Sequence, residues 1–183
     1  MENKKPAVLV LADGTVYNGI AIGATGTTTG EIAFNTGMTG YQEVFTDPSY
    51  TGQIIIMSNV HIGNYGVKST DVESKSVKIH GLIGRNLEEK FSRAQADGNL
   101  NDYLIENNIV SIEGLDTRAL VTHVRQSGAM NCIISSDNLD VEALKAQLAK
   151  VPSMDGLELA STVSTKEVYE LGDVKSPIKI SVL

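Results

Sequence analysis

The chain has 183 residues, enough for one ordinary domain, or for one domain with a connecting tail. Its 22 acidic and 15 basic residues give a net charge of -7, which argues against nucleic acid or an anionic membrane as the main partner. The single cysteine cannot form an internal disulfide, and no stretch approaches the ~20 apolar residues of a membrane helix. Because the N-terminus also lacks the long apolar centre of a signal peptide, we predict a cytoplasmic protein.

The first third of the chain is expected to form strands and turns. Apolar residues at 8–11 and an extended stretch at 15–17 flank Asp13-Gly14, a pair that tolerates the positive φ of a tight turn, so we predict a β-hairpin. Residues 31–34 form a further strand candidate. Residues 53–57 contain three consecutive isoleucines, which is typical of a strand buried on both faces.

Two segments between these strands are rich in turn residues. The run 23–30 holds several glycines but matches neither the P-loop nor the dinucleotide fingerprint, so we interpret it as a loop between strands. The segment 35–51 places small hydroxyls, glycines and tyrosines around an Asp-Pro-Ser turn, in which Ser49 offers a hydroxyl and a backbone N–H. This segment could hold a small polar ligand, or it could be turn chemistry alone.

The second half of the chain alternates helices with strands. Helix starts are predicted at Asn99, Asp116 and Asp140, whose side chains are of the type that caps the first backbone N–H groups of a helix. Gly128 and Pro152 are expected to end the second and third helices. The predicted strands of this half are residues 109–112 and 130–135, and a further strand is predicted before it, over residues 77–83.

This order of elements predicts a mixed α/β fold with helices on one side of layered sheets, in a single domain over residues 1–151. Residues 152–177 no longer show the composition of packed helices and strands, and we interpret them as a linker. Apolar and polar residues alternate over residues 178–183, which end in two apolar residues, so this segment is expected to form a β-strand. The strand could open a further domain that supplies its neighbours, or it could be an edge strand of the same domain.

Few side chains are arranged for metal or nucleophilic chemistry. His61, His80 and His123 lack the close spacing of a structural zinc site, so we predict no metal site. Cys132 falls in a predicted buried strand, where a thiol behaves as a small hydrophobe. No glycine-flanked serine or cysteine elbow occurs.

Three separated motifs, in this order, resemble the opening of the small subunit of carbamoyl-phosphate synthetase. The first is Gly30-Glu31, Phe34-Asn35-Thr36, Met38-Thr39-Gly40-Tyr41-Gln42-Glu43 and Thr46-Asp47-Pro48-Ser49-Tyr50. The second is Ile62-Gly63-Asn64-Tyr65-Gly66, and the third is Leu115-Asp116-Thr117-Arg118-Ala119-Leu120 with Arg125 and Gly128-Ala129-Met130. The resemblance runs from about residue 8 to about residue 169 and departs from the family locally, for example at Val60, where relatives often have proline.

The resemblance implies a layered β/β/α domain of the swivelling type. In the family this domain precedes a class I glutaminase domain with a Cys-His-Glu triad, of which residues 178–183 would be the first strand. The small subunit pairs with a large subunit and sends it ammonia from glutamine through a tunnel. The large subunit is a ligase that uses bicarbonate and two ATP to make carbamoyl phosphate for pyrimidine and arginine biosynthesis. ATP and magnesium are expected in that subunit, and no cofactor in this domain.

The resemblance also implies a role for one residue of this chain. The domain would help to join the subunits, and Ser49 would reach toward bound glutamine to position it, without making or breaking a bond. No catalytic residue is expected in this chain, so the chain alone would be inactive. The alternatives are a free-standing, non-catalytic interaction module, and a small-molecule binding domain that uses the Ser49 loop without any synthetase.

Overall fold

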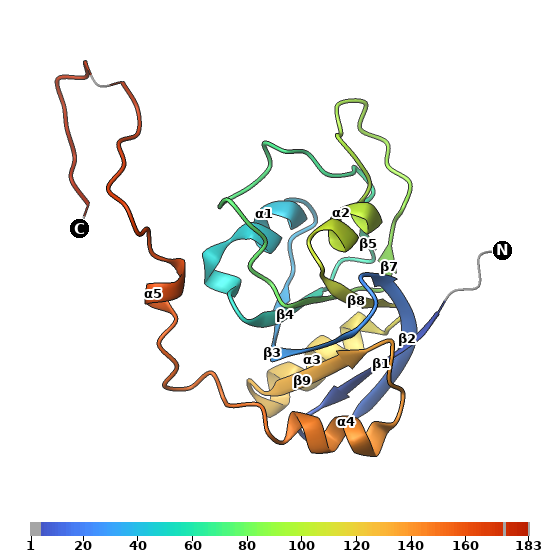
Figure 1. Cartoon of the computed structure of the whole chain (residues 1–183). Helices are drawn as coiled ribbons and strands as arrows, with labels where there is room; N and C mark the ends of the chain where they lie inside the picture. The colour runs from blue at the N-terminus through green and yellow to red at the C-terminus, as the bar shows by residue number, and fades with distance from the viewer. Residues whose placement is uncertain (1–4, 174, 183) are drawn as a thin grey trace.

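The computed structural model describes residues 5–173 and 175–182. Seven strands of this part close into one barrel, in the order β1-β2-β8-β6-β4-β3-β9 (Figure 1). The barrel strands are β1 (Pro6–Leu11), β2 (Val16–Gly23), β3 (Thr27–Asn35), β4 (Gln53–Met57), β6 (Gly81–Ile83), β8 (Val110–Glu113) and β9 (Asn131–Ser135). Two short strands, β5 (His61–Ile62) and β7 (Asn86–Leu87), form a separate parallel pair.

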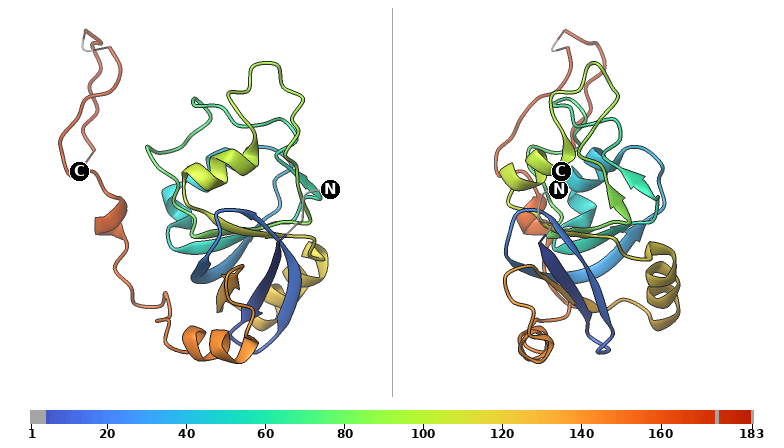
Figure 2. Two further views of the ribbon diagram at one scale, coloured as in Figure 1. Left: turned by 45° about the vertical axis from the view of Figure 1, so that its right-hand side comes forward. Right: turned by 90° about the vertical axis from the view of Figure 1, so that its right-hand side faces the viewer.

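The chain also forms short helices, all of which except α5 lie against the barrel or its loops. They are α1 (Tyr41–Thr46), the 3-10 helix η1 (Pro48–Tyr50), α2 (Leu100–Glu106), α3 (Thr117–Ser127), α4 (Val141–Leu148) and α5 (Ala160–Val163). α1 and α2 lie on one side of the barrel and α4 lies on the opposite side (Figures 1 and 2). No helix within the described part of the chain is long and apolar enough to span a bilayer.

The β1–β2 hairpin is confirmed, and so is its turn. β1 pairs antiparallel with β2, and the Asp13 carboxylate accepts the backbone N–H of Thr15 at 2.9 Å across the turn. The four strands β3, β4, β6 and β8 run parallel to one another, so their carboxyl ends lie at one end of the barrel. β9 then pairs antiparallel with both β1 and β3 and closes the sheet.

β4 is buried on both faces, as its isoleucines predict. Ile54 and Ile56 join the apolar cluster that fills the barrel, while Ile55 and Met57 join a second cluster beneath α1 and α2. Every one of these four side chains is buried, so the strand has no polar face. A third cluster, under α4, covers the outer face of β1 and β9.

The three predicted helix starts are confirmed with their caps. Asn99 accepts the backbone N–H of Asp102 at 2.9 Å, and Asp116 accepts that of Ala119 at 3.0 Å. Asp140 caps α4 in the same way. Satisfying these first N–H groups is what fixes where short helices begin.

The α/β class is confirmed, but the helices cover opposite sides of the sheet and not one side as expected. The reason is closure, because the apolar outer residues of β4 and those of β1 and β9 lie on different sides of the closed barrel, and each set needs its own cover. The strand predicted over 77–83 is short, since only Gly81–Ile83 joins the ladder. The run 23–30 is not all loop, because β3 already begins at Thr27.

The segment 35–51 contains α1, which the sequence analysis missed. The predicted linker carries the short helix α5, and it leads away from the barrel (Figure 2). Residues 178–182 pair with no described strand, so they are not an edge strand of this barrel, and Leu183 lies outside the described residues. Whether this segment opens another domain stays a prediction.

Candidate functional site

Ser49 lies in the middle of the one-turn helix η1, directly after α1. The Asp47 carboxylate caps this turn and accepts the backbone N–H of Ser49 at 2.8 Å. The Ser49 side chain is exposed, and its hydroxyl has no hydrogen-bond partner among residues 5–173 and 175–182. The hydroxyl is therefore available to a ligand.

The turn that carries Ser49 is held by side chains on both sides of it. The hydroxyl of Thr51 donates to the Pro48 carbonyl at 2.7 Å, and the Asn35 amide donates to the Tyr50 hydroxyl at 3.1 Å. Pro48 at the first helical position fixes its own φ. These contacts give the exposed hydroxyl a defined place at the surface.

The helix before the turn buries most of its side chains. Tyr41 and Phe45 are fully buried in the cluster over the outer face of β4. Gln42 exchanges two hydrogen bonds of 2.8 Å with the backbone of Lys68. The Thr46 hydroxyl donates to the Gln42 carbonyl at 3.0 Å and accepts the backbone N–H of Glu73 at 2.9 Å. Much of the first motif is thus structural and anchors the long loop that follows β5.

The second motif contacts the first directly, and the third contacts the segment that follows β4. The Tyr65 hydroxyl accepts the backbone N–H of Gly40 at 2.7 Å, which joins the second motif to the first. The side chain of Asn59 donates to the Met38 carbonyl at 3.3 Å, and Thr117 of the third motif donates to the Ser58 carbonyl at 3.5 Å. The sequence analysis found the three motifs separately, and the structure joins the first and second through Tyr65 and Gly40, while most of the third lies in α3.

The loops that follow the carboxyl ends of β3 and β4 expose apolar side chains. Met38 is 75% exposed and Val60 is 43% exposed. The two loops are joined by the Asn59 side chain, which donates to the Met38 carbonyl.

The remaining candidates for chemistry make no hydrogen bond to Ser49 within the described part of the chain. Cys132 is fully buried in the barrel interior, and that burial raises the pKa of its thiol well above the ordinary value. His61 contacts Glu88 at 2.9 Å, His123 contacts Asp13 at 2.6 Å, and His80 contacts the Thr29 carbonyl at 3.2 Å. No group of three metal-ligating side chains occurs within the described ranges.

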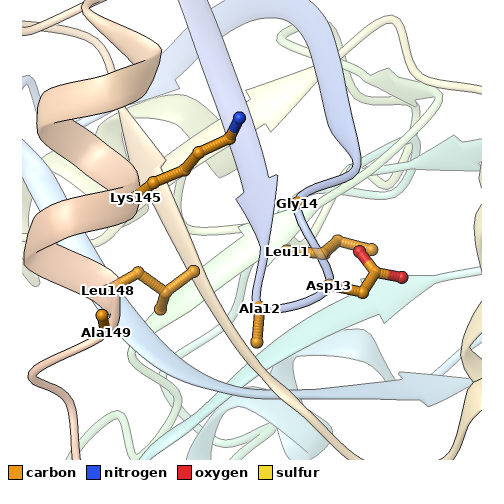
Figure 3. A pocket seen from close by; sticks show the side chains of 7 residues that line it. All are labelled: Leu11, Ala12, Asp13, Gly14, Lys145, Leu148 and Ala149. Atoms are coloured by element: carbon orange, nitrogen blue, oxygen red, sulfur yellow. The ribbon is translucent and has the colours of Figure 1, made fainter.

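A shallow hollow of about 270 Å³ lies between the β1–β2 turn and α4 (Figure 3). Its lining residues are Leu11, Ala12, Asp13, Gly14, Lys145, Leu148 and Ala149. Its charged groups are already paired, because Lys145 contacts Glu142 at 2.9 Å and Asp13 contacts His123. The hollow contains neither Ser49 nor any other residue of the three motifs.

Comparisons with known proteins agree with the motifs. Residues 9–134 match the family described as "Carbamoyl-phosphate synthase small chain, CPSase domain". Proteins named "Carbamoyl phosphate synthase small chain" are similar to this chain: one from Synechococcus is 51% identical over 170 residues, and one from Aquifex aeolicus is 45% identical over 166 residues. The alignments cover 93% and 91% of this chain but 44% and 45% of those proteins, so the chain spans less than half their length.

Solved structures add nothing to this result. An aminopeptidase from Aneurinibacillus sp. strain AM-1 aligns with a TM-score of 0.39 and 15% identity, over 70% of this chain and 30% of that one. A likeness at that level carries no argument about fold or function.

Proposed function

This chain belongs to the family of the carbamoyl-phosphate synthase small chain, and from that premise we propose that it completes the glutamine site of the glutamine-hydrolysing enzyme. The observation that carries the proposal is Ser49. Its hydroxyl is exposed, lacks a partner among the described residues, and stands on a turn fixed by Asp47 and Tyr50. A hydroxyl held in this way is suited to a small polar substrate.

Ser49 acts by positioning glutamine. Its hydroxyl hydrogen-bonds the α-carboxylate or the α-amine, an interaction worth about 0.5–1.5 kcal/mol, or somewhat more with a charged partner. Such a bond holds the substrate in the geometry that the reaction needs and takes no part in bond-making. The nucleophile belongs to a glutaminase domain with a Cys-His-Glu triad.

In the complete enzyme, the small subunit passes ammonia from glutamine to a large subunit. There, with ATP and magnesium, bicarbonate is converted to carbamoyl phosphate for pyrimidine and arginine biosynthesis in the cytoplasm. Residues 1–151 form the domain of the swivelling type, residues 152–177 form the linker, and residues 178–183 begin the glutaminase domain. The 51% identity of this chain to a small chain, over 93% of its own length, supports the assignment.

The domain also helps to join the two subunits. The exposed Met38 and Val60 on the loops beyond β3 and β4 support this part of the proposal, because burying them against a partner would be favourable. The competing role, a free-standing interaction module without a glutaminase, uses the same surface but predicts no effect of Ser49 on glutamine.

By itself the 183-residue chain is expected to release no ammonia from glutamine. Its one cysteine, Cys132, is buried in the barrel with a raised thiol pKa, so no thiolate is available to attack the amide. An ammonia assay on the purified chain tests this, and measurable release would contradict it.

The decisive experiment is Ser49→Ala in the complete small subunit paired with its large subunit. We expect the KM for glutamine to rise about threefold to tenfold, which corresponds to loss of one such hydrogen bond, with a smaller change in kcat. Ser127→Ala is the matched control, because Ser127 is also exposed and its hydroxyl has no partner within the described part of the chain. An unchanged KM in Ser49→Ala would remove Ser49 from the glutamine site.

A further inference from the structure

The side chain of Asn35 connects three parts of the first motif. Asn35 is the last residue of β3, and its Oδ1 accepts the backbone N–H of Gly37 at 2.7 Å. Its Nδ2 donates to the Tyr50 hydroxyl at 3.1 Å. One amide therefore ties the barrel both to the loop after β3 and to the turn that carries Ser49.

Tyr50 reaches Asn35 from the residue directly after Ser49. Its ring is half-buried and packs on the apolar cluster beneath α1, which includes Ile55 and Met57. Apolar packing holds the ring at the surface of this cluster but is non-directional. The hydrogen bond from Asn35 adds the direction, because it fixes the position of the hydroxyl at the end of the ring.

The Ser49–Asp47 and Asn35–Tyr50 hydrogen bonds have different structural roles. The bond from the Ser49 N–H to Asp47 lies within the turn, so it sets the shape of the turn. The bond between Asn35 and Tyr50 joins the turn to β3, so it adds to the chain connections with α1 and β4 in fixing where the turn lies on the barrel. A displacement of about 1 Å is enough to weaken a positioned hydrogen bond to a substrate.

We infer that Asn35 and Tyr50 are positioning residues that aim the Ser49 hydroxyl at glutamine. This inference rests on the function proposed above and adds the contact that fixes Ser49 in place. Neither residue needs to touch the substrate. Tyr50 contributes through its hydroxyl oxygen, which accepts the hydrogen bond from the Asn35 amide. A phenylalanine at this position would keep the packing of the ring but lose this hydrogen bond.

The test is Tyr50→Phe in the complete subunit, alone and combined with Ser49→Ala. We expect Tyr50→Phe to raise the KM for glutamine about threefold, with kcat nearly unchanged, and to add nothing further once Ser49→Ala is present. That non-additivity distinguishes positioning from general destabilisation. Tyr17→Phe is the matched control, since its hydroxyl has no hydrogen-bond partner among residues 5–173 and 175–182.

Each outcome decides between the two proposals. If Ser49→Ala raises the KM and Tyr50→Phe leaves it at the wild-type value, or if the two effects multiply, the positioning role is wrong and the proposed function stands. If Ser49→Ala leaves the KM unchanged, the proposed function fails first. Amide hydrogen exchange of the 183-residue chain gives a reading without turnover: Tyr50→Phe frees the Asn35 amide that accepts the Gly37 N–H, so exchange of the Gly37 N–H should speed up at least about threefold, and an unchanged rate would contradict the inference.

Discussion

The rings of Tyr41 and Tyr65 stack with their centroids 4.3 Å apart and their planes 23° from parallel. The Tyr65 hydroxyl accepts the backbone N–H of Gly40 at 2.7 Å and that of Tyr41 at 3.3 Å, at the start of α1. Gly40, the N-cap residue, has no side chain to cap the helix. Tyr65, which lies 25 residues after Gly40 in the sequence, therefore takes the place of a local capping side chain.

Tyr65→Phe tests this cap. The ring stack remains, but the N–H groups of Gly40 and Tyr41 lose their acceptor, so we expect the free energy of unfolding to fall by about 1–2 kcal/mol. Urea denaturation of the purified chain measures the change. Tyr17→Phe, on the β1–β2 hairpin, serves as the reference substitution. Equal stability of the two variants would show that the Tyr65 hydroxyl caps nothing.

A second prediction concerns Gly63, which lies directly after β5 and two residues before Tyr65. Gly63 has φ +95°, and a Cβ at this position would lie 2.5 Å from the Glu88 carbonyl oxygen. Gly114 has a similar φ of +85° but open space around it. Gly114→Ala should therefore cost only the backbone strain, about 1–2 kcal/mol, whereas Gly63→Ala should cost about 1–3 kcal/mol more. Thermal unfolding of both variants makes the comparison, and equal losses would rule out the close approach at Gly63.

The helices show what could and could not be predicted from the sequence. α2, α3 and α4 were predicted because Asn99, Asp116 and Asp140 cap them locally. α1 was missed because its start depends on Tyr65, a contact between residues far apart in the sequence. Glycines on one side of α1 and an Asp-Pro pair on the other made the segment resemble turns.

Barrel closure was also beyond the sequence. Alternation identifies which strands are buried, but the pairing of β9 with both β1 and β3 depends on contacts between distant segments. The strand at 77–83 was predicted too long for a related reason. Lys78 N–H donates to the Phe45 carbonyl, in a helix, so that part of the backbone is satisfied outside the sheet. At the candidate site, the family motif identified Ser49, while the supporting role of Asn35 needed coordinates.

The contact between Asp13 and His123 predicts a pH dependence of stability. Partial burial raises the pKa of the Asp13 carboxyl, but the hydrogen bonds from Thr15 and the contact with His123 together lower it by more, so the pKa lies below its usual value. The ionised carboxylate therefore stabilises the fold above the unfolded-state pKa of about 4, and this contribution is lost as the pH falls through the folded-state pKa.

Asp13→Asn should therefore be less stable than the wild type at pH 7, and the difference should shrink at pH 3. Urea denaturation at the two pH values measures both differences. Asp155→Asn is the control, because Asp155 is exposed and its carboxylate has no partner within the described ranges. A difference that stays constant between pH 7 and pH 3 would contradict the role assigned to the Asp13 carboxylate.

The last prediction concerns the thiol of Cys132. This side chain is fully buried among the interior residues of the barrel, such as Leu9 and Ile134, and burial raises the pKa of the thiol. A thiol reagent should label the folded chain at least about a hundredfold more slowly than the urea-unfolded chain, because reaction requires the barrel to open. Ser127→Cys supplies an exposed thiol as the control, and it should react at once in the folded state. Rapid labelling of Cys132 itself in the folded chain would show that the thiol is accessible, and it would remove the physical reason for expecting the isolated chain to leave glutamine intact.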